Sequence, residues 1–211
     1  MTIYPELQHF VEKHIDKIES KQFAWLYQEL VMNEVDITSR FTELMLSIGV
    51  SPLDNLVVIP SEYLAGASIE GFAVPTHIQA IQSHAFKECM HLKKIDFTGN
   101  NSLNKIELAA FAYCESLKEL NLRDTSIVGV SSELCYSCKK LERVVLPNTV
   151  KFIDNLAFYN CNNLLEINIP TSVTDIAKDA FSCSYRVKFV CKRGSYADKY
   201  AEEHDIECIY L

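Results

Sequence analysis

Glycine and proline are scarce in this 211-residue sequence, with six of each, and there is a single tryptophan. This scarcity excludes a collagenous or low-complexity chain, and 48% hydrophobic with 23% charged residues is typical of a folded globular protein. No apolar run approaches the roughly 20 residues that cross a bilayer, so we expect no membrane contact. Basic residues are in the minority as well: 20 Lys and Arg against 28 Asp and Glu give a net charge of −8, which disfavours nucleic acid as a direct partner.

Residues 1–20 lack the apolar centre of a secretory signal peptide, because acidic side chains such as Glu6, Glu12 and Asp16 interrupt them. If Met1 is the natural start, we expect a cytoplasmic protein. If the start was trimmed, a cell-surface or secreted protein is the better interpretation.

The familiar sequence motifs of catalysis are missing too. There is no P-loop, G-x-S-x-G, H-E-x-x-H or G-x-G-x-x-G motif, and no carboxylate pair stands out from the general surface charge. We therefore expect no enzyme activity, no catalytic residue and no cofactor.

What the sequence does contain is an internal repeat of 23 to 25 residues. Copies with the same residue types in the same order begin at Ile81, Ile106, Val130 and Ile153. A shorter copy begins at Ile176 and a degenerate one at Val58, so we predict six copies between Pro52 and Cys191. The best copy consists of Ile153, Ala157, Phe158, Cys161, Leu164, Ile167 and Ile169.

This unit, roughly I-x-x-x-A-F-x-x-C-x-x-L-x-x-I-x-I-P, resembles the BspA-like branch of the leucine-rich repeat family. Residues 194–206 are similar to the closing segment common in that family. The resemblance implies a solenoid and a non-enzymatic, protein-binding function, and its members are often adhesion or interaction proteins of the cell surface. The Asn or Cys that follows the strand in generic leucine-rich repeats is missing here.

Within each copy, period-two alternation predicts a short strand, as where Ile95 and Phe97 face one side and Lys94 and Asp96 the other. The A-F-x-x-C segment predicts one helical or 3₁₀ turn. A single coil cannot bury its own apolar face, so the coils must stack. We predict an α/β solenoid: a right-handed leucine-rich repeat of six coils over residues 52–191, with a parallel β-sheet of six strands.

Caps are predicted at both ends of the stack. Helical spacing of apolar residues predicts two or three helices over residues 5–49, in a helical N-terminal cap that spans residues 1–51. At the other end, residues 192–211 predict a C-terminal cap. It consists of a short helix from the N-cap Ser195 to Glu203, followed by a strand in which Ile206, Cys208 and Tyr210 alternate.

Eight cysteines invite a metal or disulfide interpretation. Five of them, however, are assigned to one position of the repeat, too far apart in sequence for a zinc site: Cys89, Cys114, Cys138, Cys161 and Cys183. Cys135 forms the only C-x-x-C with Cys138, but it replaces the phenylalanine of the repeat, which indicates core packing. We expect buried, reduced thiols and no metal site. His77, His84 and His91 fall at different positions around the coil and predict no metal either.

Two surfaces are candidates for binding a partner protein. The first is the outward side of the sheet, where one column changes sign from strand to strand and the next column is small and polar; its residues are Lys94, Glu119, Arg143 and Glu166, and then Asp96, Asn121, Val145 and Asn168. This alternation indicates either a ladder of surface ion pairs or a docking surface. The second is a strip of Tyr113, Tyr136 and Tyr159, either exposed or packed on the next coil.

The protein is expected to be a monomer whose partner is another protein. One further hypothesis stays open on charge alone. An acidic protein of this kind could act as an inhibitor that occupies a basic nucleic-acid-binding surface.

Overall fold

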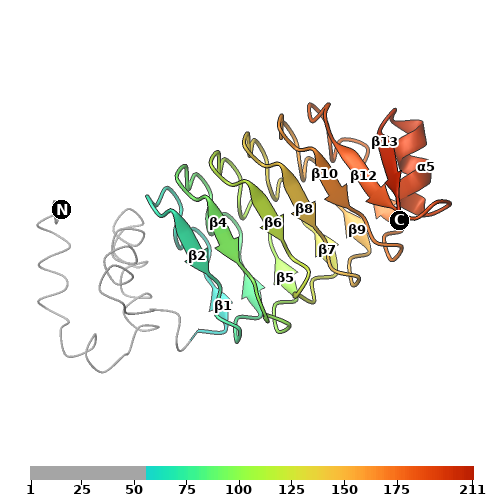
Figure 1. Cartoon of the computed structure of the whole chain (residues 1–211). Coiled ribbons are helices and arrows are strands. Elements are labelled where there is room, and N and C mark those ends of the chain that lie inside the picture. Colours follow the sequence, from blue (N-terminus) through green and yellow to red (C-terminus); the bar gives the residue numbers. More distant parts are fainter. Residues whose placement is uncertain (1–55) are drawn as a thin grey trace, which may run out of the picture.

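The computed structural model describes residues 56–211, which form a β-solenoid built around one seven-stranded parallel sheet (Figure 1). The predicted helical N-terminal cap, residues 1–51, lies outside the described residues. The strands of this large sheet follow one another along the solenoid axis in chain order. They are β2 (Gly71–Ala73), β4 (Lys94–Asp96), β6 (Glu119–Asn121), β8 (Arg143–Val145), β10 (Glu166–Asn168), β12 (Lys188–Cys191) and β13 (Glu207–Tyr210).

The large sheet has one strand more than the repeat alone predicts. The predicted C-terminal strand is present as β13, and it pairs in parallel with β12, with Phe189 opposite Cys208. The segment that closes the solenoid therefore extends the sheet, and the backbone of β12 is paired on both sides.

A second set of strands, each two residues long, lies one per coil beside the large sheet (Figure 1). They form two separate three-stranded parallel sheets, which the sequence analysis did not predict. The first contains β1 (Val58–Ile59), β3 (Ala80–Ile81) and β5 (Lys105–Ile106), and the second β7 (Gly129–Val130), β9 (Phe152–Ile153) and β11 (Asp175–Ile176).

The predicted helical turns of the coils are wrong: the A-F-x-x-C segments are hydrogen-bonded turns without helix. In the second coil, His84 and Glu88 both have φ of 62°, a left-handed conformation that a right-handed helix cannot contain. Alternate amides donate to the next coil, as where the Phe86 N–H donates to the Ala110 carbonyl at 2.8 Å, and the amides between them close local turns, as where the Lys87 N–H donates to the His84 carbonyl at 3.0 Å. The described residues are thus a β-solenoid whose one helix, α5 (Tyr196–Glu203), lies at the C-terminal end.

Stacked aromatic rings run through the core. Phe86 and Phe111 stack at 5.3 Å between ring centroids, and Phe158 and Phe181 stack at 5.4 Å. Cys135, fully buried, occupies the same position of the coil between these two pairs, as its place in the repeat predicts. Each coil therefore buries its apolar residues against the coils before and after it.

The repeated cysteines form a second column, in which each thiol donates to a backbone carbonyl of the preceding coil. The Cys89 Sγ lies 3.0 Å from the Leu64 carbonyl oxygen, and the Cys114 Sγ lies 3.1 Å from that of Phe86. Cys138 and Cys161 repeat the contact at 3.1 Å, and all four side chains are buried, as predicted. Burial raises the pKa of the Cys114, Cys135 and Cys161 thiols.

The assignment of Cys183 to this column is wrong. Cys183 is partly exposed and has φ of 63°, whereas Ser184 is buried in the cysteine position and its Oγ donates to the Phe158 carbonyl at 2.6 Å. The last coil is therefore not one residue shorter at this point. A serine replaces the thiol as the hydrogen-bond donor.

Helix α5 covers the end of the core, and its predicted N-cap is confirmed. The Ser195 Oγ accepts a hydrogen bond from the Asp198 N–H at 3.3 Å. The buried Tyr200 ring stacks on Phe189 with centroids 6.0 Å apart, and its hydroxyl donates to the Ala177 carbonyl at 3.1 Å.

Candidate protein-docking surface

The register of the large sheet aligns the predicted charged column. Lys94 is paired with Glu119, Glu119 with Arg143, and Arg143 with Glu166. The column then continues through Lys188 to Glu207. We call these six residues the charge ladder. Lys188 and Glu207 were not predicted to belong to this column. The strand β12 lies in the last, irregular copy of the repeat, and β13 lies outside the repeat.

Most of the charge ladder does not close into ion pairs. Among the described residues, only its last two members form an ion pair, with Lys188 Nζ 2.8 Å from a Glu207 carboxylate oxygen. Lys94 instead bonds Asp96 of its own strand at 3.4 Å. Glu119, Arg143 and Glu166 are exposed and form no ion pair within the described part of the chain. The middle of the face therefore presents charged groups that solvent or a partner must satisfy.

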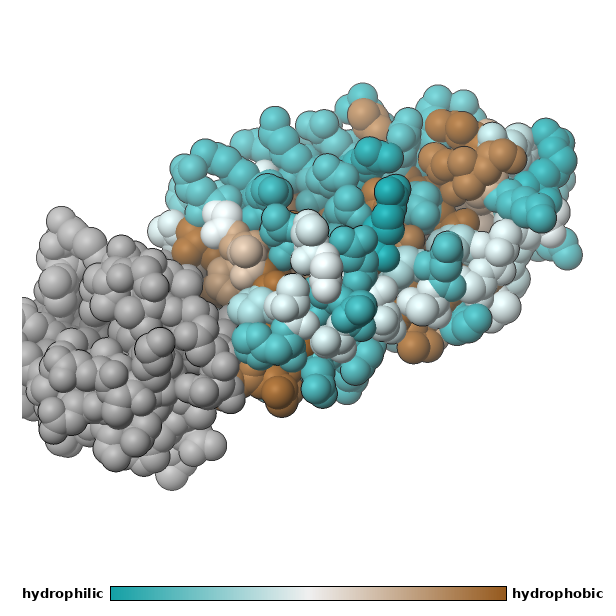
Figure 2. Space-filling view, turned by 60° about the horizontal axis from the view of Figure 1, so that its bottom comes forward, coloured by the Kyte–Doolittle hydropathy of each residue, from teal (hydrophilic) through white to brown (hydrophobic). Residues whose placement is uncertain are grey.

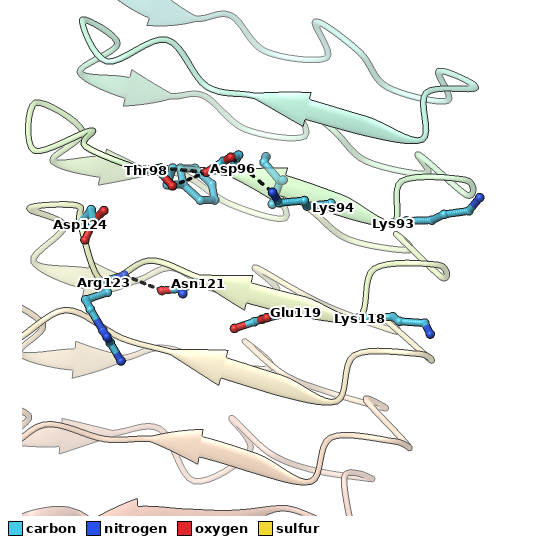
Figure 3. A pocket seen from close by; sticks show the side chains of 11 residues that line it. Lys93, Lys94, Asp96, Thr98, Lys118, Glu119, Asn121, Arg123 and Asp124 are labelled. Atoms are coloured by element: carbon cyan, nitrogen blue, oxygen red, sulfur yellow. Dashed lines mark hydrogen bonds and ion pairs between the residues drawn. The ribbon is translucent and has the colours of Figure 1, made fainter.

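The adjoining polar column is partly engaged by its own backbone. The Thr98 hydroxyl and N–H donate to the Asp96 carboxylate at 2.6 and 3.0 Å (Figure 3). These bonds, with Lys94 beside them, hold the pKa of Asp96 below its usual range. Asn168 bonds both the N–H and the carbonyl of Leu146, at 2.6 and 3.3 Å. Asn121 is exposed, and its Oδ1 accepts the Arg123 N–H at 3.2 Å.

Val145 does not belong to this surface. Its side chain is only 4% exposed, although alternation placed it outward. In register it lies between Asn121 and Asn168, and the Asn168 amide reaches across to the backbone beside it. Because Val145 is buried, it does not offer the exposed side chain that was predicted for docking.

A hollow of about 520 Å³ interrupts the surface between β4 and β6. The register of β4 and β6 contains the single pair Lys94 and Glu119, whereas β6 and β8 pair at three positions. In Figure 3, Lys93 and Lys118 lie toward one end of the hollow, and Arg123 and Asp124 toward the other. The hollow is lined by Lys93, Lys94, Ile95, Asp96, Phe97, Thr98, Lys118, Glu119, Asn121, Arg123 and Asp124.

The ends of this hollow were not predicted from the sequence. Lys118 directly precedes β6, and Arg123 and Asp124 follow it after one buried residue, so none of them takes part in the alternation within the strand. Lys93, which precedes β4, is bonded to Glu70 of the preceding coil at 2.9 Å. The hollow combines four basic with three acidic side chains, which suits a polar protein segment better than a polyphosphate.

The predicted tyrosine strip is a column of neighbouring rings on the turns of three coils, in which Tyr136 and Tyr159 are stacked and Tyr113 is tilted against Tyr136. Ring centroids are 5.4 Å apart for Tyr113 and Tyr136, and 4.7 Å apart for Tyr136 and Tyr159. Tyr113 is 38% exposed, and the other two are half-buried. Tyr185, 89% exposed, was not predicted; its hydroxyl lies 3.7 Å from the Cys183 Sγ. Much of the surface of the Tyr136 and Tyr159 rings is thus buried in contacts between coils.

Figure 2 shows a face that is hydrophilic over much of its area, with hydrophobic residues in separate patches, one of them toward the C-terminal end. Exposed large hydrophobic side chains at that end include Ile209 and Leu211. Within the described part of the chain, no helix has the length and apolar character needed to span a membrane.

The stacked coils, the parallel sheet and the repeated residues define a leucine-rich repeat solenoid. Residues 57–188 match the BspA type leucine rich repeat region in six copies. The chain belongs to this family, whose repeats are typically scaffolds for protein interaction.

Two bacterial structures are similar to the chain. One is a leucine rich cell surface protein from Faecalibacterium prausnitzii, with 26% identity and a TM-score of 0.57 over 64% of this chain and 36% of that protein. The other is a leucine rich repeat protein from T. pallidum, with 27% identity and a TM-score of 0.58 over 64% of each chain. The chain thus spans less than two thirds of either relative's length. No curated protein matches the chain significantly.

Proposed function

We propose that this chain is a non-enzymatic, monomeric binding module that docks a partner protein on the outward face of its large sheet. The proposed contact residues are the charge ladder together with Asp96, Asn121 and Asn168. The observation that supports this proposal is the open middle of the ladder, where Glu119, Arg143 and Glu166 alternate in sign without pairing among the described residues.

The spacing of these charges favours a protein partner. Adjacent strands lie about 4.8 Å apart, so three neighbouring rungs present acidic, basic and acidic groups over about 10 Å. A partner with the complementary order of charges matches this face, and a shift by one strand places like charges together. The rigid stacking of the coils fixes this pattern before binding, which lowers the entropic cost of docking.

Photo-crosslinking in the native host tests the location of this surface. The photo-reactive residue benzoylphenylalanine replaces Glu119 in the middle of the ladder. The control replaces Lys151, an exposed residue directly before β9 on the side of the small sheets. We expect a discrete protein adduct from position 119 and none of the same mass from position 151. Adducts from position 151 alone would place the docking surface elsewhere.

A second candidate function is adhesion at the cell surface. It is favoured by the similarity to the Faecalibacterium prausnitzii protein, which is described as a cell surface protein. Labelling of intact host cells with an antibody against this chain tests it. Surface labelling without permeabilisation supports adhesion, and labelling only after permeabilisation supports an intracellular partner.

A further inference from the structure

Three metal-ligating side chains converge at the C-terminal cap from three different elements. Cys191 ends β12, Asp198 lies in the first turn of α5, and Cys208 lies in β13. The two Sγ atoms are 3.6 Å apart, and these atoms and a carboxylate oxygen of Asp198 all lie within 4.8 Å of one another. Among the described residues, this is the one group of three or more His, Cys, Asp or Glu side chains that converges so closely.

The sulfur separation fits shared coordination of a metal ion. Zinc binds thiolates at about 2.3 Å, and in a tetrahedral site two such sulfurs are about 3.8 Å apart. The observed 3.6 Å is close to that value. A disulfide requires about 2.0 Å, so the sulfurs would have to approach by a further ~1.6 Å.

The carboxylate is held in place by the loop that begins the helix. Gly194, with φ of 77°, directs its N–H to the Asp198 Oδ2 at 2.7 Å, and the side chains of Tyr210 and Cys208 also interact with this carboxylate. Hydrogen bonds of this kind commonly orient metal-binding carboxylates. The hydrogen bond from Gly194 is also the main cause that lowers the pKa of Asp198, followed by the interactions with Tyr210 and Cys208 and then by the charge of Arg193.

The local charges suit a divalent ion. Two thiolates and a carboxylate around a dication leave one net negative charge, and the Arg193 guanidinium lies nearby, 4.0 Å from the centre of the Tyr210 ring. Cys191 is buried, whereas Asp198 and Cys208 are partly exposed, so an ion can enter from solvent. The repeat thiols donate to backbone carbonyls, whereas the thiols of Cys191 and Cys208 interact with each other.

We propose that Cys191, Asp198 and Cys208 bind a thiophilic divalent cation of the zinc class, which ties the closing helix and strand to the last coil. Two thiols lose their protons to solvent when the ion binds, so each ion replaces two protons. Solvent takes the fourth position of the tetrahedron. No metal was expected from the sequence, because the Cys-x₆-Asp-x₉-Cys spacing begins at the end of the last repeat and extends into the cap, away from the repeated cysteine position.

The test uses the full chain, reduced and stripped with a chelator, and titrates it with Zn²⁺ alone. We expect one equivalent to bind, by competition with a chromophoric chelator, and the melting temperature to rise. Cys208→Ser and Asp198→Asn each weaken binding at least about tenfold. The control Cys183→Ser changes a partly exposed thiol outside the group and leaves binding unchanged.

Cobalt provides a spectroscopic readout that does not depend on stability. Bound Co²⁺ gives sulfur-to-metal charge-transfer absorption, which Cys208→Ser reduces. The proposal is overturned if no stoichiometric binding occurs, if Asp198→Asn and Cys208→Ser bind as tightly as the original chain, or if the purified protein carries a Cys191–Cys208 disulfide as its resting form.

Discussion

At the scale of single residues, one hydrogen bond explains why the repeat carries a cysteine at a fixed position. The Phe86 carbonyl accepts the Cys89 N–H within its own turn at 3.2 Å, and the Cys114 thiol of the next coil adds a second hydrogen bond to the same oxygen. In the last coil the Ser184 hydroxyl takes the place of the thiol. A cysteine donates this bond and still packs as a small apolar residue.

These thiols predict that the protein is less stable in alkali. Burial raises the pKa of Cys114, Cys135 and Cys161, so the folded chain keeps protons that the unfolded chain releases above about pH 8.5. Their contribution to stability is complete below that pH and is lost above it. The free energy of unfolding should fall by up to about 1.4 kcal/mol per pH unit for each thiol. Urea titrations between pH 8 and 10 measure this slope.

Cys135→Val is the control for this prediction, because it removes one ionisable group from the core. Its slope should be shallower by about 1.4 kcal/mol per pH unit, whatever its absolute stability. Identical slopes for the two proteins would contradict the assignment of a raised pKa to Cys135.

At the scale of the element, the strand pairs depend on individual side chains. Gly129 of β7 is paired with Phe152 of β9, and the Phe152 ring covers the glycine so closely that a Cβ on Gly129 would lie 2.0 Å from the ring's Cζ. The ring is 40% exposed and can rotate away, but it then gives up its contact with β7.

A double-mutant cycle tests this contact. Gly129→Ala should destabilise the protein by about 1 kcal/mol because the ring is displaced. In a Phe152→Ala background the same change should be neutral or stabilising, since alanine then reduces only the entropy of the unfolded chain. Thermal unfolding of the four proteins measures the coupling, and an equal cost in both backgrounds would show that the ring is not responsible.

Strands were predictable where alternation and repetition act together, and turns were not. Lys94 and Asp96 flank Ile95 in the pattern of a one-sided strand, and β4 has the predicted residues. A Phe and a Cys three residues apart are compatible with a helical turn as well as with the non-helical turn that the structure contains. The structure differs because residues such as Glu88 adopt left-handed φ, a choice made by hydrogen bonds to the next coil and not by local sequence.

At the scale of the whole molecule, the repeat predicted the stack and the closing helix but not how its surface is used. Side-chain direction identified the charged column, yet the burial of Val145 depends on how far the Asn168 amide reaches from the next strand. The hollow between β4 and β6 depends on incomplete pairing of two strands. Neither feature is encoded in one coil, because both arise between coils.

The solenoid also predicts a specific role for its C-terminal cap. Deleting residues 192–211 removes β13 and α5, leaves β12 with an unpaired edge and exposes Phe181 and Phe189, which Tyr200 covers. We expect aggregation and loss of a single cooperative unfolding transition.

Tyr200→Ala is a milder form of this change, because it removes the ring and leaves the backbone of the cap. It should cost about 3 kcal/mol. Calorimetry and light scattering measure both effects, and a soluble 1–191 chain with an unchanged melting temperature would contradict the capping role.

The affinity of the partner for ladder variants tests the central claim most directly. Once the partner is isolated by crosslinking, its dissociation constant is measured for Lys94→Glu, Arg143→Glu, Tyr136→Ala and Tyr159→Ala. The two charge reversals should change stability by no more than about 1 kcal/mol, because both side chains are exposed. Each should weaken binding at least about tenfold by placing like charges together, while the tyrosine variants bind normally. Unchanged affinity for both reversals, with binding lost in Tyr136→Ala or Tyr159→Ala, would contradict the proposed face and place the site on the tyrosine strip.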